Sequence, residues 1–350
     1  MAEVYRLNAS TLGKAYRDRL SDFQTWDQRS HATEWILHEE NVGEYMSIDE
    51  TAPSRGDLFT ILSNKDGHGR KGTVASIVSG TDSGELTAVF DRIPLEKRLG
   101  VREVTMDFSD SMSAAVTHSF PNARITIDCF HVVQLVSSAL GEMRMRHKRK
   151  EMKEDARRRR EFKRKIRRNN GQRRKRELER RQAGVRKSSR GRRPNRANMQ
   201  YVSPRLENGD TAVELLTRSR YLIVQSRDKW TDPQKKRAEV LFDRYPDMLQ
   251  AYNLVNRLRT IFKNKDSSVE TGKSELTTWC ADVQLTKFDS LKTAAETIES
   301  RIDEVANYFG QRHTNAAAES LNSKLKGFRS MLRGVSDLPF FMYRVSTIFG

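Results

Sequence analysis

Three stretches that each lead from apolar residues into an aspartate constrain the fold of this chain more than any other feature. Each stretch has the length and the apolar content of a β-strand. In an α/β sheet, functional groups gather at the carboxyl ends of the strands. Any one of these aspartates is more simply explained as a turn residue, but the three together predict carboxylates at one edge of a sheet. The stretches are residues 45–51, 102–108 and 123–131, and their aspartates are Asp49, Asp107 and Asp128.

A fourth acidic residue, Glu319, lies in a predicted helix that begins with small residues. Thr314 or Asn315 is a suitable N-cap, and the alanines that follow favour the first turn. Helical spacing places polar residues on the face of Glu319 and an apolar stripe on another face. The polar residues are Asn315, Asn322, Ser323 and Lys326, and the apolar residues are Leu321, Leu325 and Phe328. The polar face is either simply solvated or holds a hard divalent cation beside a phosphate. The three strand-end aspartates favour the second interpretation.

The order of the other predicted elements agrees with a sheet of this kind. Residues 59–63 and 73–78 indicate a hairpin, so residues 43–80 form three sequential antiparallel strands. A helical segment interrupted at Pro94 precedes the strand of Asp107, and a short helix over residues 111–120 precedes the strand of Asp128. Three hairpin strands, then alternating helix and strand, with a late acidic helix, is the ribonuclease H order.

Several motifs resemble those of a family of bacterial insertion-sequence transposases, the ISL-three family, which has an aspartate-aspartate-glutamate triad. The motifs are Ile48-Asp49-Glu50-Thr51, Val104-Thr105-Met106-Asp107, Phe120-Pro121-Asn122-Ala123, Ile127-Asp128-Cys129-Phe130-His131-Val132-Val133, and Thr314-Asn315-Ala316 with Glu319-Ser320-Leu321-Asn322. The resemblance covers residues 30–140 and 270–350. It implies that Asp49, Asp107 and Glu319 are the catalytic triad. Asp128, His131 and Asn322 are then supporting residues.

The resemblance also implies the chemistry, which is metal-dependent DNA strand cleavage and strand transfer at the ends of a mobile element. Two Mg²⁺ ions, with Mn²⁺ as a substitute, would lie roughly 3.5–4 Å apart, bridged by Asp49 and held also by Asp107 and Glu319. The expected partners are element ends, target DNA and a second copy of the chain, because paired ends favour a homodimer. For His131, contact with the scissile phosphate, orientation of Asp128 and stabilisation of the following helix stay open.

The positive charge of the chain is concentrated in one segment. The net charge is +18, but residues 141–200 hold 27 Lys or Arg against 7 Asp or Glu, so the other 290 residues sum to −2. The segment cannot bury a core, and we expect it to be helical at most in pieces, or disordered until bound. It predicts salt-dependent, sequence-independent binding to the phosphates of a nucleic acid. A solvated tract is the simpler alternative, and the bacterial resemblance argues against a nuclear-localisation signal. The predicted DNA-binding residues are Arg157, Arg158, Arg159, Arg160, Lys163, Arg164, Lys165, Arg173, Arg174, Lys175, Arg176 and Lys326.

Residues 205–310 predict an all-α insertion between Asp107 and Glu319. Asp232-Pro233 marks the start of one helix, because proline is favoured in the first turn. Further helices are expected over residues 247–262, 276–283 and 291–309. Within them, Trp279 is either a core residue or a side chain that stacks on an extruded base.

The residues before the first predicted strand are expected to form helices over 12–26 and 32–38, with Trp26, Trp35 and Ile36 as anchors on the catalytic domain. No module that reads DNA ends through base contacts is evident there. Either a separate protein supplies end recognition, or the copy is truncated, or the basic segment and the insertion take over part of the recognition.

The predicted fold class is therefore α/β: a ribonuclease H-like mixed sheet with flanking helices, interrupted by a large all-α insertion that contains the highly basic segment. The expected parts are an N-terminal helical segment (1–42), the first part of the catalytic domain (43–140), the basic segment (141–204), the helical insertion (205–310) and the C-terminal helices with Glu319 (311–350).

The composition of the chain argues against several other classes of protein. No apolar run approaches the roughly 20 residues of a membrane span, and no signal peptide opens the chain. Cys129 and Cys280 indicate neither a disulfide framework nor a zinc ribbon, so a cytoplasmic protein is expected. Two alternatives to an active transposase are a non-catalytic or degenerate transposase-derived nucleic-acid-binding protein and a ribonuclease H-like structure-selective nuclease. Intact acids at the triad positions count against the first, and the long insertion counts against the second.

Overall fold

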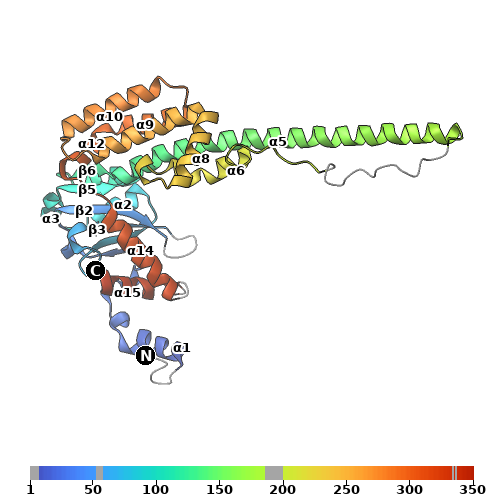
Figure 1. Cartoon of the computed structure of the whole chain (residues 1–350). Helices are drawn as coiled ribbons and strands as arrows, with labels where there is room; N and C mark the ends of the chain where they lie inside the picture. The colour runs from blue at the N-terminus through green and yellow to red at the C-terminus, as the bar shows by residue number, and fades with distance from the viewer. Residues whose placement is uncertain (1–7, 53–57, 186–199, 333–334, 336) are drawn as a thin grey trace. The chain divides into compact units, whose positions relative to one another are not determined.

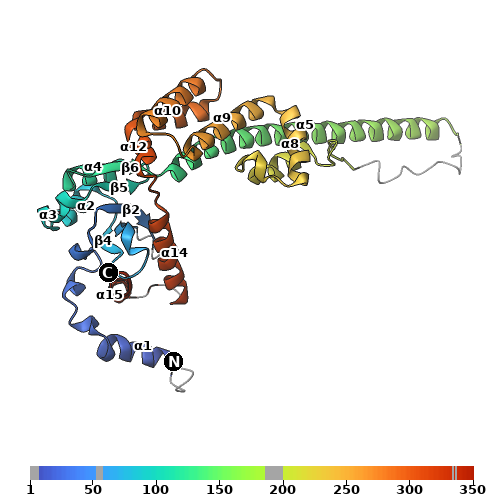
Figure 2. The ribbon, with the colours of Figure 1, turned by 60° about the vertical axis from the view of Figure 1, so that its left-hand side comes forward.

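The computed structural model describes residues 8–52, 58–185, 200–332, 335 and 337–350. It divides into two compact units, and Figures 1 and 2 show the chain from two sides. The first, here called the sheet unit, comprises Met1–Gln134, Ile261–Thr278 and Thr297–Gly350. The second, the helical unit, comprises Leu135–Thr260 and Trp279–Glu296.

The sheet unit is built on a six-stranded mixed sheet with the strand order β1-β4-β3-β2-β5-β6 (Figure 1). β2, β3, β4 and β1 pair antiparallel, whereas β2 with β5 and β5 with β6 pair parallel. The strands are β1 (Trp35–Leu37), β2 (Tyr45–Thr51), β3 (Phe59–Asn64), β4 (Val74–Ser79), β5 (Glu103–Met106) and β6 (Arg124–Ile127). Antiparallel hairpin strands continued by two parallel strands are the ribonuclease H-like arrangement that the sequence predicts.

The helices between these strands also follow the sequence. α2 (Ser83–Phe90) and α3 (Leu95–Gly100) are separated around Pro94, as predicted, and α4 (Asp110–Ser119) precedes β6. Each longer helix begins at a side-chain cap: Asp82 accepts hydrogen bonds from the backbone of Gly84 and Glu85, and Ser109 accepts one from Met112. These caps satisfy N–H groups that the first helical turn leaves unpaired.

A hydrophobic core joins one face of the sheet to the last two helices, α14 (Ala316–Met331) and α15 (Leu338–Phe349). Ile61 of β3 belongs to this core together with Leu321, Leu325 and Phe328 of α14, so the apolar stripe predicted beside Glu319 is confirmed. Ile61 is also the cross-strand partner of Asp49. Paired residues of neighbouring strands project from the same face of a sheet. α14, which runs along the sheet in both views, therefore covers the face from which Asp49 projects (Figures 1 and 2).

The N-terminal residues differ from the sequence prediction. The expected helix over residues 12–26 is replaced by α1 (Ala9–Ala15), a π-helical turn over Tyr16–Leu20 and short 3₁₀ turns. The expected helix over residues 32–38 was wrong, because Trp35–Leu37 forms β1 and pairs antiparallel with β4. Ile36 is buried in the core while its two neighbours are half-buried, which is the alternation of a strand.

The expectation that the basic segment is helical only in pieces was also wrong. Cys129–Gln182 forms one helix of 54 residues, α5 (Figure 1). Arginine, lysine, glutamate and glutamine are good helix formers, and no proline interrupts the run. Ion pairs one turn apart reduce the repulsion, with Arg157 beside Glu154 and Glu161, and Arg181 beside Glu177. Part of the predicted segment, residues 186–199, lies outside the described residues.

The helices of the insertion are close to those predicted. Pro233 lies in the first turn of α8, as expected. Trp279 is fully buried and its indole N–H donates to the Leu254 carbonyl at 2.9 Å, so it is a core residue and not a stacking platform. The helices are α6 (Ala212–Arg218), α7 (Arg220–Ile223), α8 (Asp232–Arg244), α9 (Pro246–Lys263), α10 (Val269–Gln284), α11 (Asp289–Ser300), α12 (Ile302–Ala306) and α13 (Tyr308–Gln311).

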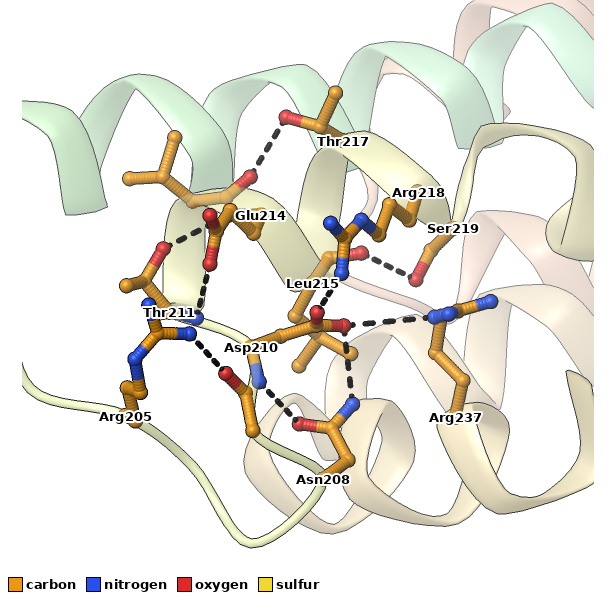
Figure 3. Close-up of polar contacts among 12 residues, drawn as sticks. Arg205, Asn208, Asp210, Thr211, Glu214, Leu215, Thr217, Arg218, Ser219 and Arg237 are labelled. Atoms are coloured by element: carbon orange, nitrogen blue, oxygen red, sulfur yellow. Dashed lines mark hydrogen bonds and ion pairs between the residues drawn. The ribbon is translucent and has the colours of Figure 1, made fainter. Parts of the chain in front are cut away.

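A buried aspartate organises the start of α6 in the helical unit. The Asp210 carboxylate accepts hydrogen bonds from Arg218 and from the Asn208 amide, and Arg237 lies 3.5 Å away (Figure 3). Thr211 and Glu214 form a reciprocal capping box beside it. Arg218 and Arg237 thus each form an ion pair with Asp210 inside the helical unit. Within the described residues, no helix combines the length and the apolar character that a bilayer crossing requires.

Candidate active site

The three strand-end aspartates lie in one row on one face of the sheet. In the parallel register, Ser47 pairs with Thr105 and Thr105 pairs with Thr126. Asp49, Asp107 and Asp128 each follow two residues later, so their side chains project from the same face as that buried row. Neighbouring strands lie about 4.7–4.9 Å apart, so the three aspartates follow one another across this edge of the sheet. We call Asp49, Asp107 and Asp128 the acid row.

His131, in the first turn of α5, lies against the acid row. Its Nδ1 is 2.7 Å from Asp107 Oδ1 and 3.5 Å from Asp128 Oδ2, and Asp128 is almost completely buried. Asp107 first and then Asp128 raise the pKa of His131 to about 10, although burial opposes the shift. The two carboxylates thus favour the protonated form of the ring, whose positive charge partly compensates theirs.

α14 brings Glu319 to the same place through two asparagines. Asn322 Nδ2 donates to Asp49 Oδ2 at 2.7 Å and to the Glu50 carbonyl at 3.1 Å. The buried Asn315 donates to the Ile48 carbonyl at 3.4 Å instead of capping its own helix. Asn315 is the N-cap residue, but neither candidate makes a side-chain cap of the expected kind; Thr314 Oγ1, one residue earlier, accepts from the Ala316 N–H at 3.4 Å. The polar face of α14 is thus tied to the end of β2.

One compact group of possible metal ligands is present among the described residues, and it consists of Asp128, His131 and Glu319. Ligand atoms of these three side chains lie within 4.8 Å of one another. Of the predicted triad, only Glu319 belongs to this group. Asp107 adjoins it through His131, and Asp49 adjoins Asn322. The structure thus gathers all six predicted catalytic and supporting residues in the sheet unit.

The pKa of Asp49 is raised by burial and by the neighbouring acids. Burial raises its pKa to about 6, and the negative charges of Asp107 and Glu319 act in the same direction. The Glu50 backbone N–H and the charge of His131 oppose the shift only partly. A site in which carboxylates disfavour each other's charge is one that a bound cation stabilises.

Sequence reasoning missed three polar residues next to the site. Glu103 is buried and lies on the same face of β5 as Thr105 and Asp107, and its Oε1 is 3.1 Å from His313 Nδ1. Lys65 Nζ donates to the Thr314 carbonyl at 2.9 Å, and burial lowers its pKa to about 8 against the attraction of Glu103 and Asp128. The alternation Glu103-x-Thr105-x-Asp107 is the signal that could have identified the buried glutamate.

Residues 46–345 match the model of the ISL-three family of aspartate-aspartate-glutamate transposases, described as transposase. The chain belongs to this transposase family. No curated protein and no solved structure matches it. The matched residues include the whole acid row, α5 and α14, so the family resemblance predicted from the motifs is confirmed.

A transposase acts on DNA, and the basic residues predicted to contact it lie mostly on the surface of α5. Arg157, Arg159 and Arg160 are exposed, while Arg158 is half-buried and 3.8 Å from Glu151. Lys163–Lys165 and Arg173–Arg176 are exposed as well, as is Lys326 on α14. From residue 163 to residue 182 the helix has 11 Lys or Arg and 2 Glu. We call residues 163–182 of α5 the basic helix segment.

Proposed function

We propose that this transposase cleaves DNA strands at the ends of an insertion sequence and transfers them to target DNA by metal-dependent phosphoryl transfer. Asp49, Asp107 and Glu319 are the proposed catalytic triad and the ligands of two Mg²⁺ ions, with Mn²⁺ as a substitute. The observation that supports this assignment is the row of strand-end aspartates on the sheet face that α14 covers, with Asn322 linking that helix to Asp49.

The side chains present fit a hard divalent cation. Carboxylate oxygens are its preferred ligands, and the pKa of Asp49 is raised first by burial and then by the negative charges of Asp107 and Glu319, which a bound cation would offset. When bound, such ions activate the attacking water or 3′-hydroxyl and stabilise the leaving oxygen. The remaining tasks belong to the chain itself: Asn322 orients Asp49, and His131 holds Asp107 and Asp128 in place through its Nδ1.

The basic helix segment is the proposed binding surface for the DNA backbone. Successive residues of an α-helix are separated by about 100° around its axis, so the 11 basic side chains are distributed over most of its circumference. Such a surface neutralises phosphates without reading bases, and its affinity falls steeply with salt. Two copies of the chain on paired ends, and a separate protein for end recognition, belong to the same proposal.

The decisive experiment is the Asp107→Asn variant. The amide keeps the size of the side chain but removes the charge that holds a metal ion. Strand cleavage and strand transfer on element ends should therefore both fall by several orders of magnitude, while duplex binding and the melting temperature stay near the wild type. Asp110→Asn is the matched control, because Asp110 is fully exposed three residues further along the chain.

Two further outcomes would change the assignment. Asp128→Asn should leave measurable activity if Asp128 only supports the triad. Loss of Mn²⁺ binding in Asp128→Asn together with retention in Asp107→Asn would transfer the metal site to Asp128, His131 and Glu319. A wild-type protein that binds DNA but cleaves no end would favour the degenerate, non-catalytic alternative.

A further inference from the structure

The segment that leads into α14 is held on the sheet by side chains that have no part in the predicted triad. His313 Nδ1 lies 3.1 Å from Oε1 of the buried Glu103, and Thr105 Oγ1 donates to the same oxygen at 3.4 Å. The ring of Tyr45 packs edge-on against His313 with 4.8 Å between ring centroids. An aromatic and a carboxylate from adjacent strands, β2 and β5, thus fix one residue just before the helix.

The β3–β4 hairpin holds the same helix at two further points. Lys65, directly after β3, donates to the Thr314 carbonyl at 2.9 Å. In return, Lys324 of α14 donates to the Gly69 carbonyl in the hairpin at 2.6 Å. Gly69 has φ +70°, a left-handed backbone conformation that favours glycine at this position.

These interactions reach Glu319 through the helix backbone. The Glu319 N–H donates to the Asn315 carbonyl at 2.9 Å, which is the first hydrogen bond of α14. Asn315 directly follows the two residues that Glu103 and Lys65 hold. A displacement of residues 313–315 would therefore move the Glu319 carboxylate relative to Asp128 and His131, which are now within ligand-sharing distance of it.

We propose that Glu103, His313 and Lys65 are positioning residues of this transposase: they anchor residues 313–315 to the sheet so that Glu319 completes the metal site. The inference rests on the proposed function, because it assigns Glu319 as a ligand. Residues that orient a metal ligand are typically worth about 10–100-fold in metal affinity. They belong neither to the proposed metal ligands nor to the basic helix segment, so the expected defect is in metal binding and not in duplex binding.

The test uses the full chain and Mn²⁺ alone as the probe. Lys65→Met keeps the aliphatic stem but removes the donor, and Glu103→Gln removes the charge beside His313. Both variants should bind Mn²⁺ about 10-fold or more weakly by calorimetry, and the amides of the first turn of α14 should exchange faster with solvent. Lys65→Arg, which restores a donor, should recover much of the affinity. Lys97→Met, at a lysine that pairs with Glu39 away from α14, is the matched control.

The two possible failures are distinguishable. If the wild type binds Mn²⁺ and Lys65→Met binds it equally well, the positioning inference is wrong while the metal site stands. If the wild type binds no Mn²⁺, the proposed function fails first, and exchange at the first turn of α14 still decides the inference: unchanged exchange in Lys65→Met would overturn it. The Glu103→Gln variant alone is not a sufficient test. Glu103 is buried, so a variant that fails to fold would lose both Mn²⁺ binding and amide protection.

Discussion

The acid row and the basic helix segment are the two charged regions of this transposase, and they are built in opposite ways. The acid row and Glu319 come from four separate elements, and Asp49 and Glu319 are 270 positions apart in the chain. The three aspartates are partly or fully buried and Glu319 is exposed, and charges of the group change the pKa of Asp49 and of the neighbouring His131. The basic helix segment is one contiguous stretch of exposed side chains.

The two regions differ in how strongly their charges depend on one another. Inside a protein the effective dielectric constant is low, so each buried carboxylate depends on every neighbour and on the backbone that places it. On an exposed helix, water and salt screen each charge, so basic residues contribute separately and nearly equally. A single substitution should therefore disable the acid row, whereas the basic helix segment should lose affinity in proportion to the charges removed.

The largest effect should come from substitutions in the acid row and at Glu319. Asp49→Asn and Glu319→Gln should each lower strand cleavage by several orders of magnitude, and the double variant should be scarcely worse than either single variant. Residues that act as one unit lose their function when any member is changed. Single-turnover cleavage of a pre-nicked element end would measure this. Additive losses of cleavage rate in the double variant would show that the two carboxylates act independently. The acids would then behave like the separate charges of the basic helix segment.

A smaller and graded effect should come from the basic helix segment. Replacing Arg173, Arg174 and Arg176 with glutamine keeps helix propensity but removes three charges. Affinity should fall to a similar extent for cognate and random duplexes, and the salt slope should decrease by about 1 for each phosphate that is no longer neutralised. Affinity measured against salt concentration tests both. Replacing the dispersed exposed lysines Lys229, Lys236 and Lys263 is the charge-matched control. A weakening confined to one DNA sequence would contradict an electrostatic role.

The smallest effect concerns stability, and it has the opposite sign to the effect on activity. In the metal-free protein the pKa of Asp49 is raised to about 6, above its unfolded value of about 3.9. The unfolded chain loses this proton first, so the stability of the folded state falls as the pH rises from about 4 to about 6. Asp49→Asn removes this cost. It should melt a few degrees above the wild type at pH 7.5 in EDTA, and at a similar temperature at pH 4.

Thermal melting in EDTA across this pH range checks the prediction, with Asp110→Asn as the exposed control. If Asp49→Asn melts above the wild type by the same amount at pH 4, the higher melting temperature comes from packing and not from the charge of Asp49. A lower melting temperature at pH 7.5 would show that the hydrogen bond from Asn322 outweighs the burial of the charge.

Local patterns were sufficient to predict most of the sheet unit. The strands that precede Asp49, Asp107 and Asp128 have the apolar content of buried strands, and the stripe of Leu321, Leu325 and Phe328 repeats at the helical period. Such patterns record which face of an element is buried, and for these elements the structure agrees. The motifs were equally local, and they led to the family that the comparison confirms.

Local patterns misled where two local forces compete or where an element is very short. α5 is continuous because helix propensity and ion pairs one turn apart outweigh the repulsion among its basic residues. β1 has three residues, too few for a period to be recognised, and it is a strand because β4 offers it an edge to pair with.

The sequence by itself determined the identity of the acids, the strands and helix that present them, and the charge of α5, because each follows from residues within one or two turns of one another. Only the tertiary structure decided what those acids contact. His313 meets Glu103 across 210 positions, and Asn322 meets Asp49 across 273. No periodicity links residues so far apart. Their contacts exist because the sheet buries one face under α14, and buried polar groups must then find partners there.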